Sequence, residues 1–161
     1  MGFKHLKVFC QLSNPSYRSA NEPIKLIEKV GRVGDYAKSM FGRIQYPTDA
    51  GKFTVGDVCG EDFGLTGEMK IYQLFEAFQK GGMIMLPQTV AAELVYKQSD
   101  NFKAEGWHRI YMKPIWFGGF NNVFRVQRML GELEVHEHPA DPGSEVYFSH
   151  RWLVGLPTRN T

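Results

Sequence analysis

Two histidines in the last third of the chain have the spacing of metal ligands. His136 and His138 are two residues apart, so on a β-strand both rings point to the same face. Glu145 joins them on that face if the segment 133–152 folds as a hairpin, and imidazole and carboxylate are the ligands that zinc prefers. The next nearest ligand, His150, falls on the opposite, apolar face of such a hairpin. We therefore predict a structural strand with no metal and no cofactor, and keep these residues only as a candidate site.

The same histidines carry a resemblance to a known family. The series Gly131…His136-x-His138…Glu145 resembles the first motif of the cupins, which implies a metal enzyme as our third hypothesis. Both spacings depart from the cupin motif, and the second cupin motif is absent. The sequence also contains no nucleophile elbow, P-loop, HExxH motif or dinucleotide fingerprint. We therefore expect a protein that is not an enzyme.

A glycine-rich segment indicates a different chemistry. Residues 31–34 read Gly-Arg-Val-Gly and lie between two helix-like segments. They resemble the GxxG loop with which KH domains clamp RNA phosphates, which implies phosphate contacts for Arg32, Lys38 and Arg43. The helix after the loop is short for a KH domain, and GxxG is also common where helices pack together. A small KH-like RNA-binding or regulatory module is our second hypothesis, and nucleic acid stays open as a partner.

Large aromatic residues surround a glycine pair in the segment Trp116–Phe120. Glycines favour a turn, and aromatic side chains on a turn cannot all face the core. Exposed apolar tips near cations typically contact a membrane, a neighbouring subunit or a nucleic acid. The alternative is a buried aromatic corner that closes the end of a sheet. The residues that we assign to an interface are Trp116, Phe117, Phe120, Lys113, Arg125 and Arg128.

Composition narrows the class of protein. The chain has 161 residues, of which 43% are hydrophobic and 22% charged, so we expect one globular domain spanning residues 1–161 rather than a disordered chain. A net charge of +2 is too balanced for a dedicated nucleic-acid binder. Two cysteines do not make a disulfide framework, and we find neither a signal peptide nor an apolar run of membrane-spanning length. These features predict a cytoplasmic location.

Periodicity predicts the order strand, helix, helix and then strands. Residues 6–12 alternate as a strand, and an apolar stripe with helical spacing runs from Ile24 to Ala37, interrupted at Gly31 and Gly34. The glycine- and acid-rich segment 47–65 reads as a loop with a short strand at 52–58. A helix from Thr66 to the glycines at 81–82, a short buried strand or extended link at 83–86 and a helix at 89–97 follow.

The last third alternates as β-strands. Segments 107–115 and 122–130 read as strands, and the apolar phase changes after Gly131, which predicts a β-bulge there. Asp141-Pro142-Gly143-Ser144 has the sequence of a type II turn. A hairpin closed by that turn places Glu134 opposite Arg151, Leu133 opposite Trp152 and Val135 opposite His150. We predict an α+β fold, with helices packed on a mostly antiparallel sheet and a C-terminal β-hairpin.

Four short segments together resemble the small matrix proteins of rhabdoviruses. They are residues 6–14, Gly67-x-x-x-Ile71-Tyr72-Gln73-Leu74-Phe75, Glu105-Gly106 and residues 131–135. The basic N-terminal arm and the proline-rich motif of better-known matrix proteins are missing. The resemblance implies a non-catalytic virion assembly protein that self-associates and is peripheral to the membrane and the nucleocapsid. This is our leading hypothesis, and it would place the protein in the host cytoplasm and the virion.

Overall fold

A computed structural model describes residues 6–103 and 106–157. The helices are α1 (Asn21–Glu28), α2 (Asp35–Phe41), α3 (Ile71–Lys80) and α4 (Val90–Lys97), with 3₁₀ turns η1 (Gly60–Phe63) and η2 (Ser99–Asn101). The strands are β1 (Lys7–Asn14), β2 (Gly31–Val33), β3 (Gly51–Val58), β4 (Glu68–Lys70), β5 (Trp107–Ile110), β6 (Ile115–Phe117), β7 (Phe120–Met129), β8 (Glu132–Pro139), β9 (Glu145–Tyr147) and β10 (Arg151–Gly155).

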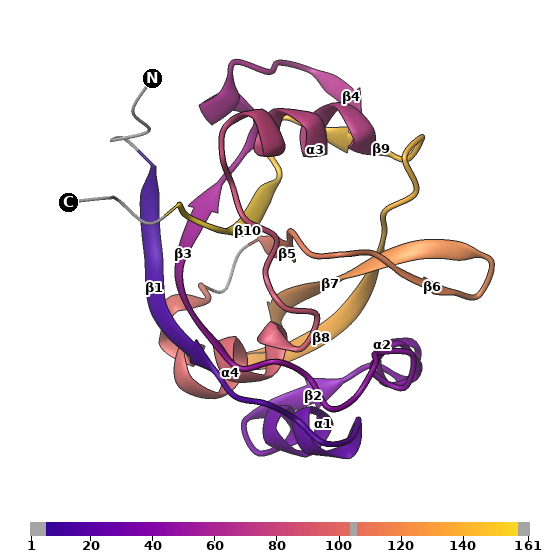
Figure 1. The fold of residues 1–161 in the computed structure, drawn as a ribbon. Coiled ribbons are helices and arrows are strands. Elements are labelled where there is room, and N and C mark those ends of the chain that lie inside the picture. The colour runs from indigo at the N-terminus through magenta and orange to yellow at the C-terminus, as the bar shows by residue number, and fades with distance from the viewer. Residues whose placement is uncertain (1–5, 104–105, 158–161) are drawn as a thin grey trace.

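Eight strands form one twisted sheet in the order β1-β3-β10-β5-β7-β8-β2, with β6 also paired to β7 (Figure 1). Only the β10–β5 and β2–β8 pairs are parallel, which confirms the α+β class with a mostly antiparallel sheet. The remaining strands, β4 and β9, form a separate two-stranded sheet. Figure 1 shows α3 with β4 and β9 at one end of the molecule and α1 and α2 at the other.

Two packing regions fill the space between helices and sheet. The apolar sequence of α4 is almost completely buried, because Val90, Leu94 and Val95 have no exposed surface. At the opposite end, α3 packs Phe75 and Phe78 against Trp152, with ring centroids 5.5 and 6.1 Å apart. Complete burial of an aromatic side chain contributes roughly 2–3 kcal/mol to folding. Trp152 therefore fixes α3 to the sheet.

A buried carboxylate joins three strands of the sheet. Asp57 on β3 is 5% exposed and accepts a hydrogen bond of 2.8 Å from the Nε of Arg151 on β10. The Nε2 of His108 on β5 lies 3.5 Å from the same carboxylate. Burial raises the pKa of Asp57, but the hydrogen bonds from His108 and Arg151 outweigh it and hold the pKa below its usual range. The ionised carboxylate thus stabilises the position of β10 between β3 and β5.

Several local predictions are confirmed. The predicted opening strand, the strand at 52–58 and the helix at 89–97 correspond to β1, β3 and α4. The apolar stripe from Ile24 to Ala37 is not one helix, because α1 ends at Glu28 and β2 begins at Gly31, where the glycines predicted a break. The backbone of Leu133 approaches Gly31 too closely for a Cβ, so glycine is required for β2 to pair with β8. Thr66 does not begin a helix, since β4 precedes α3.

The predicted C-terminal hairpin is wrong. β8 pairs with β7 and β2, whereas β10 pairs with β3 and β5. Glu134 therefore faces Gln127 and forms an ion pair with Arg32, rather than with Arg151. The same register places Leu133 opposite Arg128 and Val135 opposite Val126. The hairpin prediction failed because β8 forms a closer hairpin with the preceding strand.

Both turn predictions near that hairpin also need correction. Leu130 and Gly131 are the two-residue turn between β7 and β8, with φ of 49° and 83°, so Gly131 is no β-bulge. The turn itself accounts for the change of apolar phase. Ser144 donates to the Asp141 carbonyl as expected for a β-turn, but Gly143 lacks the positive φ of type II.

The β7–β8 turn generates a stability prediction. Leu130 has positive φ, which is unfavourable for a leucine, and its side chain is fully exposed. Leu130→Asn should raise the free energy of unfolding by about 0.5–1 kcal/mol, because Asn-Gly is the preferred type I′ sequence. Chemical denaturation measures the change. Leu130→Ser, which removes the same exposed side chain without the turn preference, should be near neutral, and an equal gain in both variants would contradict the argument.

The Asp57 network generates a pH prediction. A carboxyl with a lowered folded-state pKa stabilises the fold above its unfolded pKa, and this contribution is lost as pH falls through the folded-state pKa. Asp57→Asn should therefore cost about 2–3 kcal/mol at pH 7 and make stability less dependent on pH below about pH 4. Urea titrations from pH 2.5 to 7 measure both effects. Asp49→Asn changes the net charge equally at an exposed position and should retain the wild-type acid dependence.

Candidate functional site

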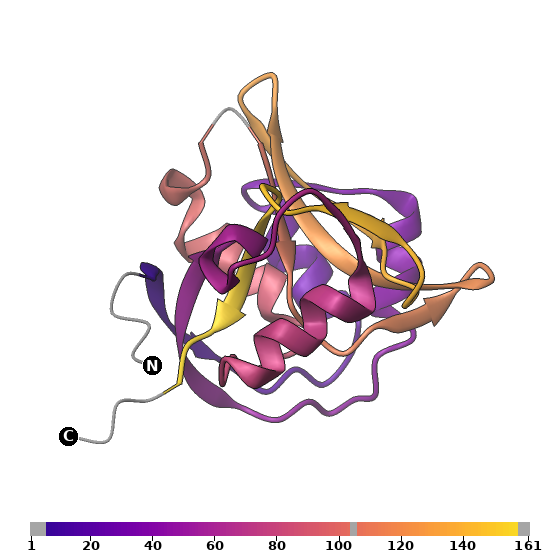
Figure 2. The ribbon, with the colours of Figure 1, turned by 90° about the horizontal axis from the view of Figure 1, so that it is seen from above.

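The hairpin formed by β6 and β7 extends away from the body of the molecule (Figures 1 and 2). Phe117 and Phe120 are paired across its end, and Gly118 and Gly119 form the turn with φ of 65° and 87°. These values are those that a two-residue type I′ turn requires. A Cβ on Gly118 would also overlap the hydroxyl of Tyr36. The glycine pair therefore permits both the tight turn and its contact with α2.

Polar anchors hold the hairpin in its extended position. The buried amide of Asn122 donates to the carbonyls of Phe117 and Phe120, each 3.1 Å away, and lies 3.5 Å from that of Ile115. The Tyr36 hydroxyl donates to the Phe117 carbonyl at 2.8 Å. Since these bonds satisfy the carbonyls of both strands, the tip is a rigid feature rather than a loose loop. Asn122 was not singled out by sequence reasoning, because its role depends on the strand pairing.

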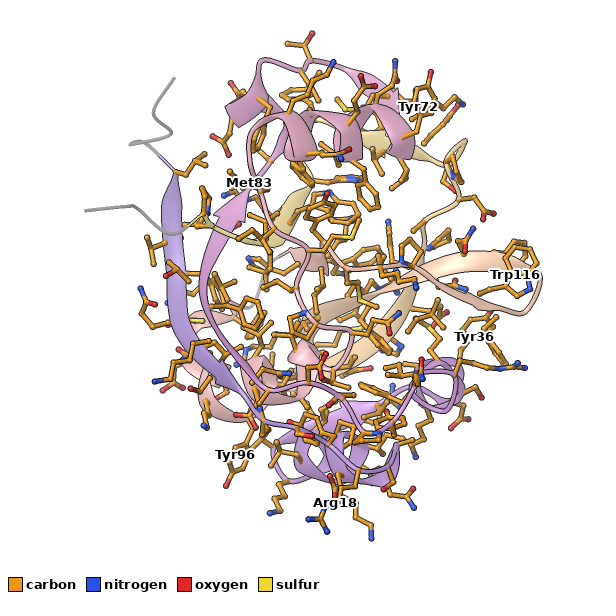
Figure 3. The ribbon with its side chains drawn as sticks, viewed as in Figure 1. Arg18, Tyr36, Tyr72, Met83, Tyr96 and Trp116 are labelled. Atoms are coloured by element: carbon orange, nitrogen blue, oxygen red, sulfur yellow. The ribbon has the colours of Figure 1, made fainter. Side chains whose placement is uncertain are left out.

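The aromatic side chains of the tip have two different environments. Trp116 is 62% exposed and Phe120 52% exposed, so neither belongs to a buried corner. Figure 3 shows Trp116 at the outer end of the hairpin. Phe117 is half-buried, with its ring 4.7 Å from that of Tyr36 and 5.4 Å from the guanidinium of Arg43. Phe117 thus supports the tip, whereas Trp116 and Phe120 present large apolar surfaces to the outside.

The cations assigned to this interface lie in three places. Lys113 is exposed near the start of β6. The guanidinium of Arg125 stacks on the Trp107 ring at 3.9 Å, towards the other end of β7. Arg128 is a structural clamp, since its guanidinium donates to three carbonyls: those of Ser99, Phe102 and Gly131. The structure therefore places Arg125 and Arg128 away from the aromatic tip.

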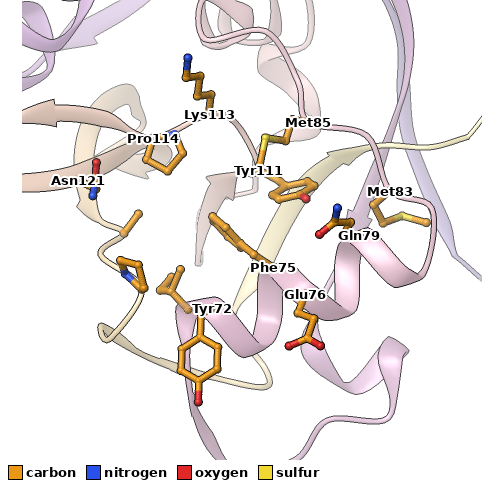
Figure 4. Close-up of a pocket in the computed structure, with 13 residues that line it drawn as sticks. Tyr72, Phe75, Glu76, Gln79, Met83, Met85, Tyr111, Lys113, Pro114 and Asn121 are labelled. Atoms are coloured by element: carbon orange, nitrogen blue, oxygen red, sulfur yellow. The ribbon is translucent and has the colours of Figure 1, made fainter.

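An apolar pocket of about 700 Å³ lies between α3 and the link from β5 to β6 (Figure 4). Its lining includes Tyr72 and Phe75 from α3, and Met85 and Tyr111 from the segments opposite. Tyr72 is 53% exposed and Met85 43% exposed, so the pocket is open to partners. The sequence did not predict this pocket, because its walls come from segments that are distant in the sequence.

The pocket reaches the base of the aromatic hairpin. Asn121 belongs both to the pocket lining and to β7, where it pairs with Trp116 on β6. Paired residues of neighbouring strands share one face of a sheet. Trp116 therefore lies on the side of the hairpin that faces the pocket entrance.

The residues of the predicted KH loop are not gathered into one site. Residues 31–33 form β2, a strand hydrogen-bonded to β8 rather than a loop. Arg32 forms an ion pair of 2.6 Å with Glu134, and Lys38 lies 3.8 Å from Glu28. Arg43 supports Phe117 instead. The geometry of a KH loop is therefore not present.

The candidate metal ligands are also separated. His136 bonds to Glu134 at 2.8 Å, and Glu145 forms an ion pair of 2.9 Å with Lys70 in the β4–β9 sheet. His138 lies against Trp152, with ring centroids 6.2 Å apart. No group of three potential ligands with metal-site geometry occurs within residues 6–103 and 106–157. The separation follows from the absence of the hairpin that would have brought Glu145 to the histidines.

Comparison of the chain with protein families, curated proteins and solved structures finds no match. None of the helices in the described part of the chain combines the length and the apolar character needed to cross a bilayer. The function must therefore be argued from the geometry of the site itself.

Asn122→Leu tests the anchoring of the hairpin. Loss of the amide leaves buried carbonyls without a donor, so we expect a cost of about 2–3 kcal/mol and faster amide exchange in β6 and β7. Denaturation and hydrogen exchange measure the two effects. Asn121→Ala is the matched control, because among the described residues Asn121 donates through its backbone N–H, to Asp141 at 2.8 Å, and not through its side-chain amide. Equal effects of the two substitutions would show that the Asn122 amide is not the anchor.

Proposed function

We propose that this protein is a non-catalytic assembly protein of viral matrix type, which self-associates through its aromatic hairpin. The observation that carries the proposal is the presence of an exposed aromatic knob and an open apolar pocket on one chain. The knob consists of Trp116 and Phe120, which are 62% and 52% exposed. The pocket lined by Tyr72, Phe75 and Met85 is its complement in chemistry and size.

The dimensions of the pocket support this pairing. A volume of about 700 Å³ falls within the range of roughly 300–1,000 Å³ in which proteins bury drug-sized ligands. The indole ring of Trp116 fits within a pocket of that volume. The β6–β7 hairpin projects from the body, which leaves its tip free to approach a second copy (Figure 2). A projecting tip of this shape is therefore better suited to a concave pocket on a neighbour than to a flat surface.

The position of the pocket favours a reciprocal contact. It begins at the base of the chain's own hairpin, where Asn121 and Lys113 line it. Two copies related by a two-fold axis can lie with their hairpins side by side, each inserting Trp116 beside the partner's Tyr111. Such an isologous contact uses the same surfaces twice. An interface built from two aromatic tips is small, so we expect weak association that depends on concentration.

The wider matrix role is also part of the proposal. In the resemblance to small rhabdovirus matrix proteins, self-association under the membrane and contact with the nucleocapsid are the functions of the family. The knob and pocket support the first of these. Membrane and nucleocapsid contacts would then be made by the assembled copies, in which each weak contact is multiplied.

Paired substitutions test the proposal. We expect wild-type protein to form dimers or larger species as its concentration increases, as measured by sedimentation velocity. Trp116→Ser removes the knob, and Met85→Glu places a charge in the pocket, so each variant should be monomeric over the same range. Mixing the two variants should restore complexes, because one retains the pocket and the other the knob. Leu130→Ser, at the exposed turn on the opposite end of β7, should associate like wild type.

Two results would contradict self-association through the knob. One is a wild-type protein that stays monomeric up to about 1 mM, a concentration at which even weak specific contacts are populated. The other is association that Trp116→Ser leaves unchanged. If Trp116→Ser instead abolished binding to liposomes while the protein stayed monomeric, the tip would be a membrane contact, and the proposed pairing would be wrong.

A further inference from the structure

Two arginines occupy opposite positions on neighbouring strands of the sheet. Arg109 on β5 pairs with Arg125 on β7, and Arg109 is only 5% exposed. Like charges directly opposite one another destabilise a sheet. Within the described residues, neither guanidinium forms an ion pair with a carboxylate, and the Nε of each is buried without a hydrogen-bond partner. The charge of Glu137 favours a higher pKa of Arg125, but burial has the larger effect, and the pKa of Arg125 is lowered.

Two histidines lie beside these arginines. The Nδ1 of His138 on β8 is buried without a partner, and the ring of His150 lies in the loop before β10. Burial, with smaller contributions from Arg109, Arg125 and His150, lowers the pKa of His138 to about 3. Burial and Arg125 together lower the pKa of Arg109 to about 10, and burial and Arg109 lower the pKa of His150. Basic side chains from four segments thus lie together, and within the described residues neither guanidinium is ion-paired with a carboxylate.

A cavity of about 330 Å³ opens beside these groups. It lies between the start of β5 and the loop before β10 and is lined by Gly106, Trp107, Arg109, Ser149, His150 and Arg151. The backbone N–H of Tyr147 lies 3.4 Å from the Nδ1 of His150, so the neutral ring carries its hydrogen at Nε2 and is a donor there. The cavity therefore offers a guanidinium, a hydroxyl and an imidazole N–H.

Trp107 forms one wall of the cavity and orders the arginines. The guanidinium of Arg125 lies 3.9 Å from its ring centroid and that of Arg109 lies 5.6 Å away. Such cation–π contacts stabilise a cation without neutralising its charge. Arg109 also donates to the Trp107 carbonyl at 3.4 Å. Trp107 thus holds both guanidinium groups in place while their charge stays available to a ligand.

We propose that this cavity binds the terminal phosphate group of a small molecule, with Arg109, Ser149 and His150 as the contacting side chains. A guanidinium matches the oxygen geometry of phosphate, and a buried one is strengthened by its low-dielectric surroundings. A terminal phosphate reaches a 5% exposed arginine more readily than a diester within a polymer. The volume of about 330 Å³ exceeds that of a bare phosphate, which leaves room for the rest of the ligand. The inference is independent of self-association through the aromatic hairpin.

Calorimetric titration of the full chain with inorganic phosphate and with glycerol 3-phosphate tests the proposal, at constant ionic strength. We expect saturable binding of both ligands and a melting temperature that rises with their concentration. Arg109→Met should weaken binding at least about tenfold, the loss expected for a charge-assisted hydrogen bond. His150→Ala, at a half-exposed position, should weaken binding without affecting the fold. Arg18→Gln removes an exposed arginine elsewhere and should bind phosphate like wild type.

Stability in phosphate-free buffer gives a second measurement. Arg109→Met should melt at a higher temperature than wild type there, because the variant no longer buries an unpaired charge. A lower melting temperature of this variant would show that Arg109 is structural and would overturn the proposal. So would the absence of phosphate binding by wild type, or equal losses in Arg109→Met and Arg18→Gln.

Two further comparisons identify the source of the anion. Glu105 lies next to Gly106 in the sequence and outside the described residues. If Glu105→Gln bound phosphate and the wild-type protein did not, a carboxylate of the chain itself would fill the cavity, and the proposal would be wrong. Single-stranded RNA and vesicles containing phosphatidic acid are the polymer and membrane probes. Tighter Arg109-dependent binding of either probe than of glycerol 3-phosphate would overturn the assignment to a small molecule.

Discussion

The arrangement of the sheet depends on the buried carboxylate of Asp57. β10 lies between β3 and β5, two strands that are far apart in the sequence. Arg151 fixes that position twice, because its Nε donates to the Asp57 carboxylate at 2.8 Å and a terminal nitrogen donates to the Asp57 carbonyl at 2.7 Å. A charge at this depth is tolerated only with its partners in place. A shift of β10 by one residue would separate them and also turn Trp152 away from α3.

The sequence predicted the elements whose signals are local. The alternation of β1 and the buried apolar run of α4 lie within the elements they specify, and the glycines that end α3 directly follow it. Local signals do not determine which strands pair. The apolar and polar residues of β8 and β10 alternate in a way compatible with a hairpin, and a turn sequence lies between the two strands. What decides their pairing is the Leu130-Gly131 turn, which lacks the Asn-Gly signature of a type I′ hairpin. Without that signature, the change of the apolar phase at Gly131 was interpreted as a β-bulge within one strand. The structure shows that a turn between two strands causes the change.

In the candidate site, too, the features set by local sequence were predicted and those set by contacts between distant segments were not. The glycine pair predicted a turn with outward aromatics, and Trp116 and Phe120 do lie outside. The pocket behind the hairpin and the Arg109–Arg125 pair were not predicted, because each depends on contacts between distant segments. Arg125 and Arg128 are three residues apart on β7 and cannot both face one side of a strand. One stacks on Trp107 and the other clamps a loop, which no pattern of charges in the sequence distinguishes.

Arg151 and Arg109 show how one sheet separates folding from binding. Both are arginines in adjacent strands, but Arg151 is matched by Asp57, whereas Arg109 lies opposite another arginine. A fold retains a local conflict of this kind where the conflict serves a function, and the stability lost there is recovered elsewhere. The paired arginine stabilises the sheet, so the unpaired one is free to meet a ligand. β7 carries both proposed surfaces, with Phe120 at one end and Arg125 five residues further along the strand, roughly 17 Å away. A ligand in the cavity therefore leaves the hairpin tip accessible, and one rigid strand can support assembly and anion binding at the same time.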